Sequence, residues 1–232
     1  MRRLQIDHVD LYQIHWPSRS HYHFRDNWRY DPTGQDRAKI DAEMIDILTV
    51  SAALMAEGKI GHVALSNETV WGAARWLQLA EAHGLPRMMT VQNEYSLMCR
   101  QFDTDWAEFS ALEDMPLLAF SPLATGLLTG KYADDVTPPL SRRVNNPNLS
   151  GRVTPRAHQA VDLYLAVAAR HGLDPAQMAI AWCRTRPFVT IPIIGATTPE
   201  QLSNAIAAAD LHLSPEVLAD LAEANRACPQ PY

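Results

Sequence analysis

The chain has 232 residues, of which 47% are hydrophobic and 20% charged, and this composition suits a soluble globular domain with a sizeable core. The formal net charge is −6 and lysine or arginine runs are absent, which excludes nucleic acid and anionic membranes as expected partners. No apolar run reaches the roughly 18 residues of a membrane span, and the N-terminus lacks a signal-peptide pattern. Cys99, Cys183 and Cys228 lack CxxC spacing and fit reduced thiols. We therefore expect one cytoplasmic domain over residues 1–232.

The first part of the chain predicts alternating strands and helices. After Arg2 to Leu4, which are typical of a helix end, Val9 to Pro17 reads VDLYQIHWP and predicts a strand with His15 at its end. The next segment, Ser18 to Asp36, is polar and aromatic, and loops of this length are usually functional or disordered. The elements predicted beyond it are a helix over Ala38 to Glu57, a strand over Ile60 to Leu65, a helix over Val70 to His83, a strand over Met88 to Val91 and a helix near Asp105 to Glu113.

The second part continues the alternation. Its predicted elements are a strand over Pro116 to Phe120, an irregular segment from Leu123 to Arg152, helices over Pro155 to His171 and Pro175 to Thr185, a strand over Val189 to Ile194, and helices near Pro199 to Asp210 and Pro215 to Ala227. Strands that alternate with helices predict an α/β fold with a parallel sheet. The alternation alone does not separate a barrel from an open doubly wound sheet.

Polar residues follow the predicted strands closely. They are His15, Ser66 with Asn67, Gln92, Ser121 and Gly195. The carboxyl ends of parallel strands meet at one edge of a sheet, so these residues are expected to share a pocket. Neutral donors and acceptors of this kind suit a neutral or anionic organic ligand better than a metal ion. The alternative is that they are ordinary polar residues at loop starts.

Six segments carry a resemblance to a known family: RLQIDHVDLYQIHWP, ALSNET, VQNEYSL, LLAFSPLATGLLTGKY, ARHGLDPAQMAIAW and IPIIGATTPEQL. Together they resemble the aldo-keto reductases, and most of all the subgroup of Tas-like and potassium-channel β-subunit-like reductases. The resemblance implies a (β/α)8 TIM barrel that transfers a hydride between NADP(H) and a small aldehyde or ketone.

The resemblance also assigns roles to residues. His15 matches the active-site histidine that orients and polarises the substrate carbonyl. Ser66, Asn67 and Gln92 match the residues that hydrogen-bond the nicotinamide carboxamide, and Phe120 matches an aromatic residue that stacks under the ring. The other implied cofactor contacts are Ser121, Pro122, Leu123, Ala124, Thr125, Gly126 and Lys131 in the pyrophosphate loop, Arg142 beside phosphate, Gly195, Thr197 and Gln201 at the adenosine 2′-phosphate, and Asn204 near the adenine.

The segment assigned to the 2′-phosphate has a second reading. Thr198, Pro199 and Gln201 form a helix capping box, and exposed N–H groups at a helix N-terminus favour phosphate. The run from Asp174 to Gln177 shows the same pattern with no phosphate implied, so simple capping stays open.

Two departures from the family pattern stand out. Relatives usually carry an asparagine where this chain has Ala205, with Asn204 one place earlier. In addition, the catalytic Asp, Tyr and Lys of the family lie on three βα units before the strand that holds His15, and these 232 residues contain no match to them. We therefore expect a truncated barrel of about five parallel strands, with impaired catalysis and open sheet edges that favour pairing with a second copy. The alternative is a non-catalytic NADP(H)-binding or interaction protein.

The other histidines, tryptophans and lysines are interpreted mainly as packing or solvated residues. A metal-dependent hydrolase would use His15, His21 and His23, but no carboxylate ligand is placed beside them, so no metal site is predicted. Trp71, Trp76 and Trp106 are expected to pack on helices, whereas Trp16 and Trp28 are candidates for substrate contact. Lys39 and Lys59 are expected to be solvated, and the closing Pro-Gln-Pro-Tyr is a tail able to fold over the pocket.

Overall fold

The computed structural model describes residues 3–232. Met1 and Arg2 lie outside the described residues, and with them part of the predicted helix end; residues 3–5 form a turn. Within the described residues, no helix has both the length and the apolar character needed to cross a bilayer.

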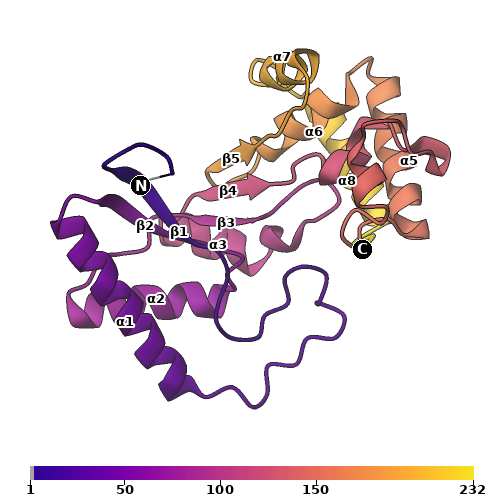
Figure 1. Cartoon of the computed structure of the whole chain (residues 1–232). Coiled ribbons are helices and arrows are strands. Elements are labelled where there is room, and N and C mark those ends of the chain that lie inside the picture. Colours follow the sequence, from indigo (N-terminus) through magenta and orange to yellow (C-terminus); the bar gives the residue numbers. More distant parts are fainter. Residues whose placement is uncertain (1–2) are drawn as a thin grey trace. The chain divides into compact units, whose positions relative to one another are not determined.

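The strands form a parallel α/β sheet in which sequence order and spatial order agree (Figure 1). Between β1 and β2 the register pairs Val9 with Ile60 and Ile14 with Leu65, and between β2 and β3 it pairs Ser66 with Gln92. Because β1 and β5 end the order, the described sheet is open rather than closed. The five strands are β1 (Val9–Ile14), β2 (Ile60–Ser66), β3 (Val91–Glu94), β4 (Leu117–Phe120) and β5 (Thr190–Ile193).

Helices follow the strands as the sequence predicts, and side chains cap most of them. Thr69 caps α2, its hydroxyl accepting from Gly72 N at 3.2 Å, and Gly84 ends that helix with a φ of 62°, which glycine adopts without strain. The helices are α1 (Arg37–Ala56), α2 (Val70–His83), α3 (Asp105–Leu112), α4 (Arg142–Asn145), α5 (Pro155–Arg170), α6 (Pro175–Cys183), α7 (Pro199–Ala207) and α8 (Pro215–Ala227), with 3₁₀ segments η1 (Gln101–Asp103), η2 (Ala124–Thr129) and η3 (Ala133–Asp135).

The third strand is displaced from its prediction. The apolar run Met88 to Val91 predicts a strand, but β3 covers Val91–Glu94, so Gln92 and Asn93 lie inside it. The preceding segment still bonds to β2, with Met89 N donating to Val63 O at 2.9 Å. Polar side chains are tolerated in β3 because the carboxamide of Asn93, which is 3% exposed, hydrogen-bonds to the backbone N and O of Glu68.

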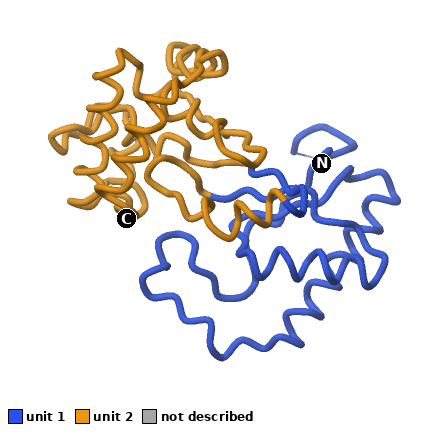
Figure 2. Tube along the Cα trace, turned by 180° about the vertical axis from the view of Figure 1, so that it is seen from behind, with its two compact units in different colours: residues 1–93, 112–117 blue, residues 94–111, 118–232 orange. Residues whose placement is uncertain are grey.

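The chain divides into two compact units (Figure 2). Unit 1 comprises residues 1–93 and 112–117, and unit 2 comprises residues 94–111 and 118–232. In unit 1, the buried stripe Ile40, Met44 and Leu48 of α1 covers β2. The expectation of a single domain stays a prediction.

The core of unit 2 is aromatic. Tyr95 stacks on Trp182 with ring centroids 5.3 Å apart, and Phe102 stacks on Trp106 at 5.0 Å. Phe188 lies 4.9 Å from Phe102, so these rings form one cluster. Close-packed aromatic pairs of this kind stabilise a core through their large buried area.

Replacing Phe102 by alanine is expected to lower the free energy of unfolding by about 3–5 kcal/mol, because a cavity would remain in the cluster. Phe102 is 1% exposed, whereas Leu140 of the same unit is 99% exposed, so Leu140→Ala is the control and should change stability little. Urea denaturation measures both variants, and equal midpoints would contradict the packing described.

Candidate functional site

Four of the predicted site residues lie together in unit 1: His15 just beyond β1, Ser66 and Asn67 at the carboxyl end of β2, and Gln92 within β3. Ser66 Oγ donates to Gln92 O at 3.0 Å, and Asn67 N donates to the same oxygen at 2.9 Å. Asn67 Nδ2 donates to His15 O at 2.9 Å and to Ser66 Oγ at 3.1 Å. Hydrogen bonds therefore join His15, Ser66, Asn67 and Gln92 into one cluster.

Asn67 has an unusual backbone and an unsatisfied side chain. Its φ is 50°, in the left-handed region that asparagine tolerates better than most residues. His15 O can only accept, so it fixes which end of the Asn67 amide carries the nitrogen. Asn67 Oδ1 is consequently a buried acceptor with no hydrogen-bond partner among the described residues. Such an atom costs about 1–3 kcal/mol unless a ligand supplies a donor.

His15 lies one residue beyond β1 and presents an exposed imidazole. Its ring centroid is 4.1 Å from that of Trp16, which is 51% exposed. Two residues earlier on the same face of β1, Gln13 Nε2 is a second buried atom without a partner in the part of the chain that the structure describes. The cluster thus offers an accessible imidazole beside an unpaired donor and an unpaired acceptor.

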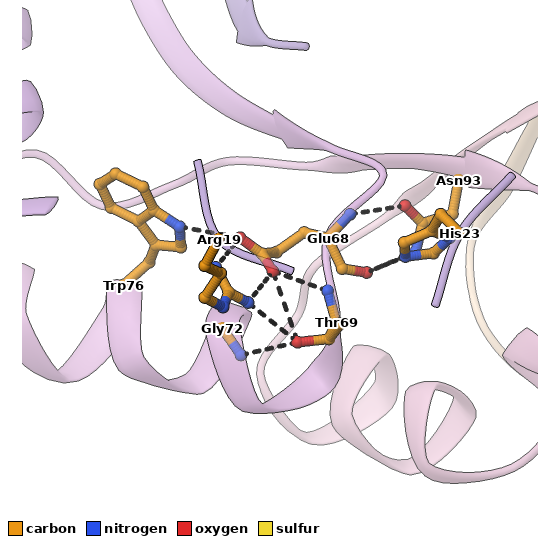
Figure 3. A network of polar contacts seen from close by, with 7 residues as sticks. All are labelled: Arg19, His23, Glu68, Thr69, Gly72, Trp76 and Asn93. Atoms are coloured by element: carbon orange, nitrogen blue, oxygen red, sulfur yellow. Dashed lines mark hydrogen bonds and ion pairs between the residues drawn. The ribbon is translucent and has the colours of Figure 1, made fainter. Parts of the chain in front are cut away.

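Glu68, which follows Asn67 directly, is the centre of a buried polar network (Figure 3). Its side chain is 2% exposed and forms an ion pair with Arg19, whose side chain is 7% exposed. Trp76 Nε1 donates to Glu68 Oε2 at 3.1 Å, and Thr69 N donates to Oε1 at 2.7 Å. A buried carboxylate requires donors of this kind, and here both oxygens have them.

The backbone of Glu68 is held as firmly as its carboxylate. Glu68 N donates to Asn93 Oδ1 at 3.1 Å, and Asn93 Nδ2 donates to Glu68 O at 3.0 Å (Figure 3). His23 Nε2 donates to the same carbonyl at 2.9 Å. Glu68, Arg19 and Asn93 are not predicted as site residues, because the only local indication of this turn is the SNET segment, in which Thr69 is a typical helix cap.

A pocket of about 180 Å³ adjoins this network inside unit 1. Both apolar and polar side chains line it, and Arg19, Glu68 and Trp76 of the network are among them. The lining residues are Ile14, Trp16, Pro17, Ser18, Arg19, Ile40, Glu43, Met44, Ile47, Leu65, Ser66, Glu68 and Trp76.

In unit 2, the segment assigned to pyrophosphate is a run of left-handed backbone. Ala124, Thr125 and Gly126 have φ values of 47°, 57° and 101°, and Ser121 has 56°. Successive N–H groups in such turns form concave sites that favour anions. Half-buried Phe120 precedes the run. Lys131 follows it with an exposed side chain, whose Nζ lies 5.1 Å from the centroid of Tyr132.

The adjacent residues Arg142 and Arg143 at the start of α4 differ in burial and in their contacts. Arg143 is buried and donates through Nη1 to Val136 O at 3.0 Å and through Nε to Pro147 O at 3.2 Å, so it supports the loop. Arg142 is exposed. Of the two, only Arg142 is therefore accessible to a ligand, and its assignment to phosphate stays a prediction.

The segment assigned to the 2′-phosphate is a capped helix start. Thr198 Oγ1 accepts from Gln201 N at 3.3 Å, and Gln201 Oε1 accepts from Thr197 N at 3.0 Å. Asn204 is committed to α6, because its Oδ1 accepts from Gln177 Nε2 at 2.6 Å and its Nδ2 donates to Asp174 Oδ1 at 3.1 Å. Adenine contact by Asn204 would compete with these bonds. Gly195 is exposed.

Comparison with known proteins decides the family. The Aldo/keto reductase family model matches residues 1–226. The chain belongs to the aldo/keto reductase family. Family members typically use a nicotinamide cofactor.

Individual relatives agree with this family assignment. The chain is 42% identical over 221 residues to "Protein tas" of Escherichia coli, covering 95% of this chain and 63% of that protein. It is 33% identical to an "Aldo-keto reductase" of Babesia bovis, covering 87% and 74% of the two chains. A solved glycerol dehydrogenase, AKR11B4 of Gluconobacter oxydans, shares the fold with a TM-score of 0.70 at 24% identity, covering 99% of this chain and 62% of that one. The chain thus spans about 63% of the length of Protein tas.

The structure also places the predicted tryptophans and the C-terminal tail. Trp76 and Trp106 are buried as predicted, but Trp71 is 47% exposed and lies under the Arg19 guanidinium, so the packing prediction was wrong for it. No group of three metal-ligating side chains occurs among residues 3–232. The tail is bound within unit 2, where Pro231 O accepts from Thr154 Oγ1 at 2.7 Å.

Burial lowers the pKa of His23 from 6.5 to about 4, opposed by the Glu68 carbonyl and assisted by the charges of His21 and Arg19. The neutral imidazole is favoured in the folded state, so its stabilising contribution is complete above about pH 6.5 and is lost as the pH falls towards 4. The shift corresponds to about 3 kcal/mol. Unfolding measured from pH 7 to 4 should therefore show a decline that His23→Gln reduces.

The exposed His83 of unit 1 provides the control, because His83→Gln leaves the network around Glu68 intact. A decline of the same size in His23→Gln and the parent chain would contradict the burial of His23.

Proposed function

We propose that this chain serves hydride transfer between NADP(H) and a small aldehyde or ketone. The observation that carries the proposal is the buried Asn67 Oδ1, which has no partner among residues 3–232 and belongs to a side chain that also bonds the backbone of His15. A primary carboxamide such as that of nicotinamide has the N–H donor that Asn67 Oδ1 lacks, so the residues present fit the group. When bound, the nicotinamide supplies the hydride.

Each residue of the cluster has a defined task in this proposal. Asn67 accepts from the carboxamide and fixes which face of the ring is presented. Ser66 and Gln92 hold the turn that carries Asn67, through the bonds to Gln92 O. His15 donates a hydrogen bond to the substrate carbonyl oxygen and stabilises the negative charge that develops there.

Residues of unit 2 support the choice of a phosphate-bearing cofactor. The left-handed run at Ala124 to Gly126 offers backbone N–H groups, and exposed Lys131 and Arg142 offer positive charge. The family resemblance assigns the capped start of α7 to the 2′-phosphate, which favours NADP(H) over NAD(H). Phe120 supplies the aromatic face for stacking.

Turnover by these 232 residues is proposed to be slow. Reduction of a carbonyl needs a proton for the developing alkoxide, and the residues that match the family include no counterpart of its catalytic tyrosine. Loss of general acid catalysis typically lowers a rate by about 10²–10⁴-fold. We therefore propose impaired catalysis for this polypeptide when it acts on its own.

Titration with NADPH, followed by its fluorescence, tests the binding part. Asn67→Gly suits the φ of 50° but removes the acceptor, and it is expected to weaken NADPH binding about tenfold. Asp114→Gly, at an exposed residue of unit 1 with a φ of 49°, is the matched control and should bind as the parent does. No fluorescence change at high protein concentration would refute cofactor binding.

Consumption of NADPH with 4-nitrobenzaldehyde tests the chemistry. We expect slow turnover that His15→Ala abolishes without loss of NADPH binding, since His15 acts on the substrate. Binding without any turnover would replace the reductase proposal by a non-catalytic NADP(H)-binding role.

A further inference from the structure

Glu68 has no assigned task, yet it is the most extensively bonded side chain near the candidate site. Its carboxylate receives donors from Arg19, Thr69 and Trp76 and is 2% exposed. A buried ion pair is a poor source of stability, because desolvation of two charges offsets their attraction. A geometric role beside Asn67 therefore explains the pair better than a contribution to stability does.

The network joins two segments that are distant in sequence. Arg19 and His23 both belong to the long loop over Ser18 to Asp36, and both bond to Glu68, one to its carboxylate and the other to its carbonyl (Figure 3). Arg19 Nη1 lies 3.2 Å from Glu68 Oε2. The loop is thereby attached at two points to the residue that follows Asn67.

The same residue fixes the turn itself. Asn67 N is held by Gln92 O, and the peptide groups of Glu68 are held on both sides by the Asn93 carboxamide. The left-handed conformation of Asn67 thus lies between two clamped positions. Because Asn67 and Glu68 share a peptide bond, a shift of Glu68 is expected to change the orientation of the Asn67 side chain.

Close packing makes the network sensitive to shape. Gly72 lies in the first turn of α2, and a Cβ there would overlap Arg19 Nη2 and the Glu68 carboxylate. Both groups are buried and bonded, so neither can move aside without breaking the pair. Glycine is therefore required at this position by the ion pair rather than by its own backbone conformation.

We propose that Glu68 and Arg19 are positioning residues that orient Asn67 Oδ1 and so couple the Ser18 to Asp36 loop to affinity for the nicotinamide end of the cofactor. This inference rests on the proposed function. It assigns no role in binding the adenosine end, for which unit 2 carries the candidate residues.

The experiment compares two ligands on Glu68→Gln, which keeps the side-chain size but removes the charge. NADPH carries the nicotinamide, whereas 2′-phospho-ADP-ribose lacks it. Binding of NADPH is expected to weaken about tenfold while binding of 2′-phospho-ADP-ribose stays within twofold of the parent chain. A merely structural defect would weaken both ligands alike, and that result would overturn the proposal, as would unchanged NADPH binding.

A matched control and a second variant complete the test. Asp41 and Arg75 form a bidentate pair in unit 1, with both oxygens 2.6 Å from the guanidinium, and Asp41→Asn should leave both affinities unchanged. Gly72→Ala keeps every charge and is expected to reproduce the selective loss of Glu68→Gln, so it decides the question if Glu68→Gln does not fold. Equal NADPH affinity of Gly72→Ala and the parent would overturn the proposal.

The same measurements distinguish failure of the proposed nicotinamide site from failure of the positioning role of Glu68 and Arg19. If the parent chain binds 2′-phospho-ADP-ribose and NADPH equally, the proposed nicotinamide site fails and the positioning role fails with it. If the parent prefers NADPH and the variants keep that preference, only the positioning role is refuted.

Discussion

A carboxylate removed from water must be surrounded by donors, and unit 1 is built around that requirement at Glu68. Arg19 and Trp76 satisfy the carboxylate, and Asn93 satisfies the peptide groups on either side of the residue. These partners come from the long loop, from α2 and from β3. The turn that bears Asn67 is therefore constrained by three elements at once, which explains how a left-handed asparagine and its unpaired oxygen persist in a buried position.

The sequence predicts that His15, Ser66, Asn67, Gln92, Ser121 and Gly195 share a pocket; hydrogen bonds join the first four, and the shared pocket stays a prediction. The predicted alternation of strands and helices is confirmed. This succeeds because hydrophobic periodicity and helix caps are local signals, and because parallel strands end at a common edge. The roles given to these residues stay predictions. The Glu68 network could not be predicted, because Arg19 and Glu68 are 49 residues apart and neither carries a local pattern.

Two predictions differ from the structure for specific reasons. The apolar residues Met88 to Val91 predict a strand that stops before Gln92, whereas β3 continues through Gln92 and Asn93 to Glu94. Polar residues inside a strand are expected only when their partners are known, and the partner of Asn93 is the Glu68 backbone. Trp71 was expected to pack, but its exposed ring lies under Arg19. In unit 2, the bonds of Asn204 to Gln177 and Asp174 depend on the start of α6 lying against α7, which no single segment reveals.

The central claim is that Asn67 Oδ1 accepts a hydrogen bond from the nicotinamide amide. The most direct measurement compares NADP⁺ with its 3-acetylpyridine analogue, in which a methyl group replaces the amide NH₂. The parent chain should bind NADP⁺ about tenfold more tightly than the analogue, and Asn67→Gly should reduce this ratio to nearly one. Equal affinity of the parent for the two ligands, or a ratio that Asn67→Gly leaves unchanged, would contradict it.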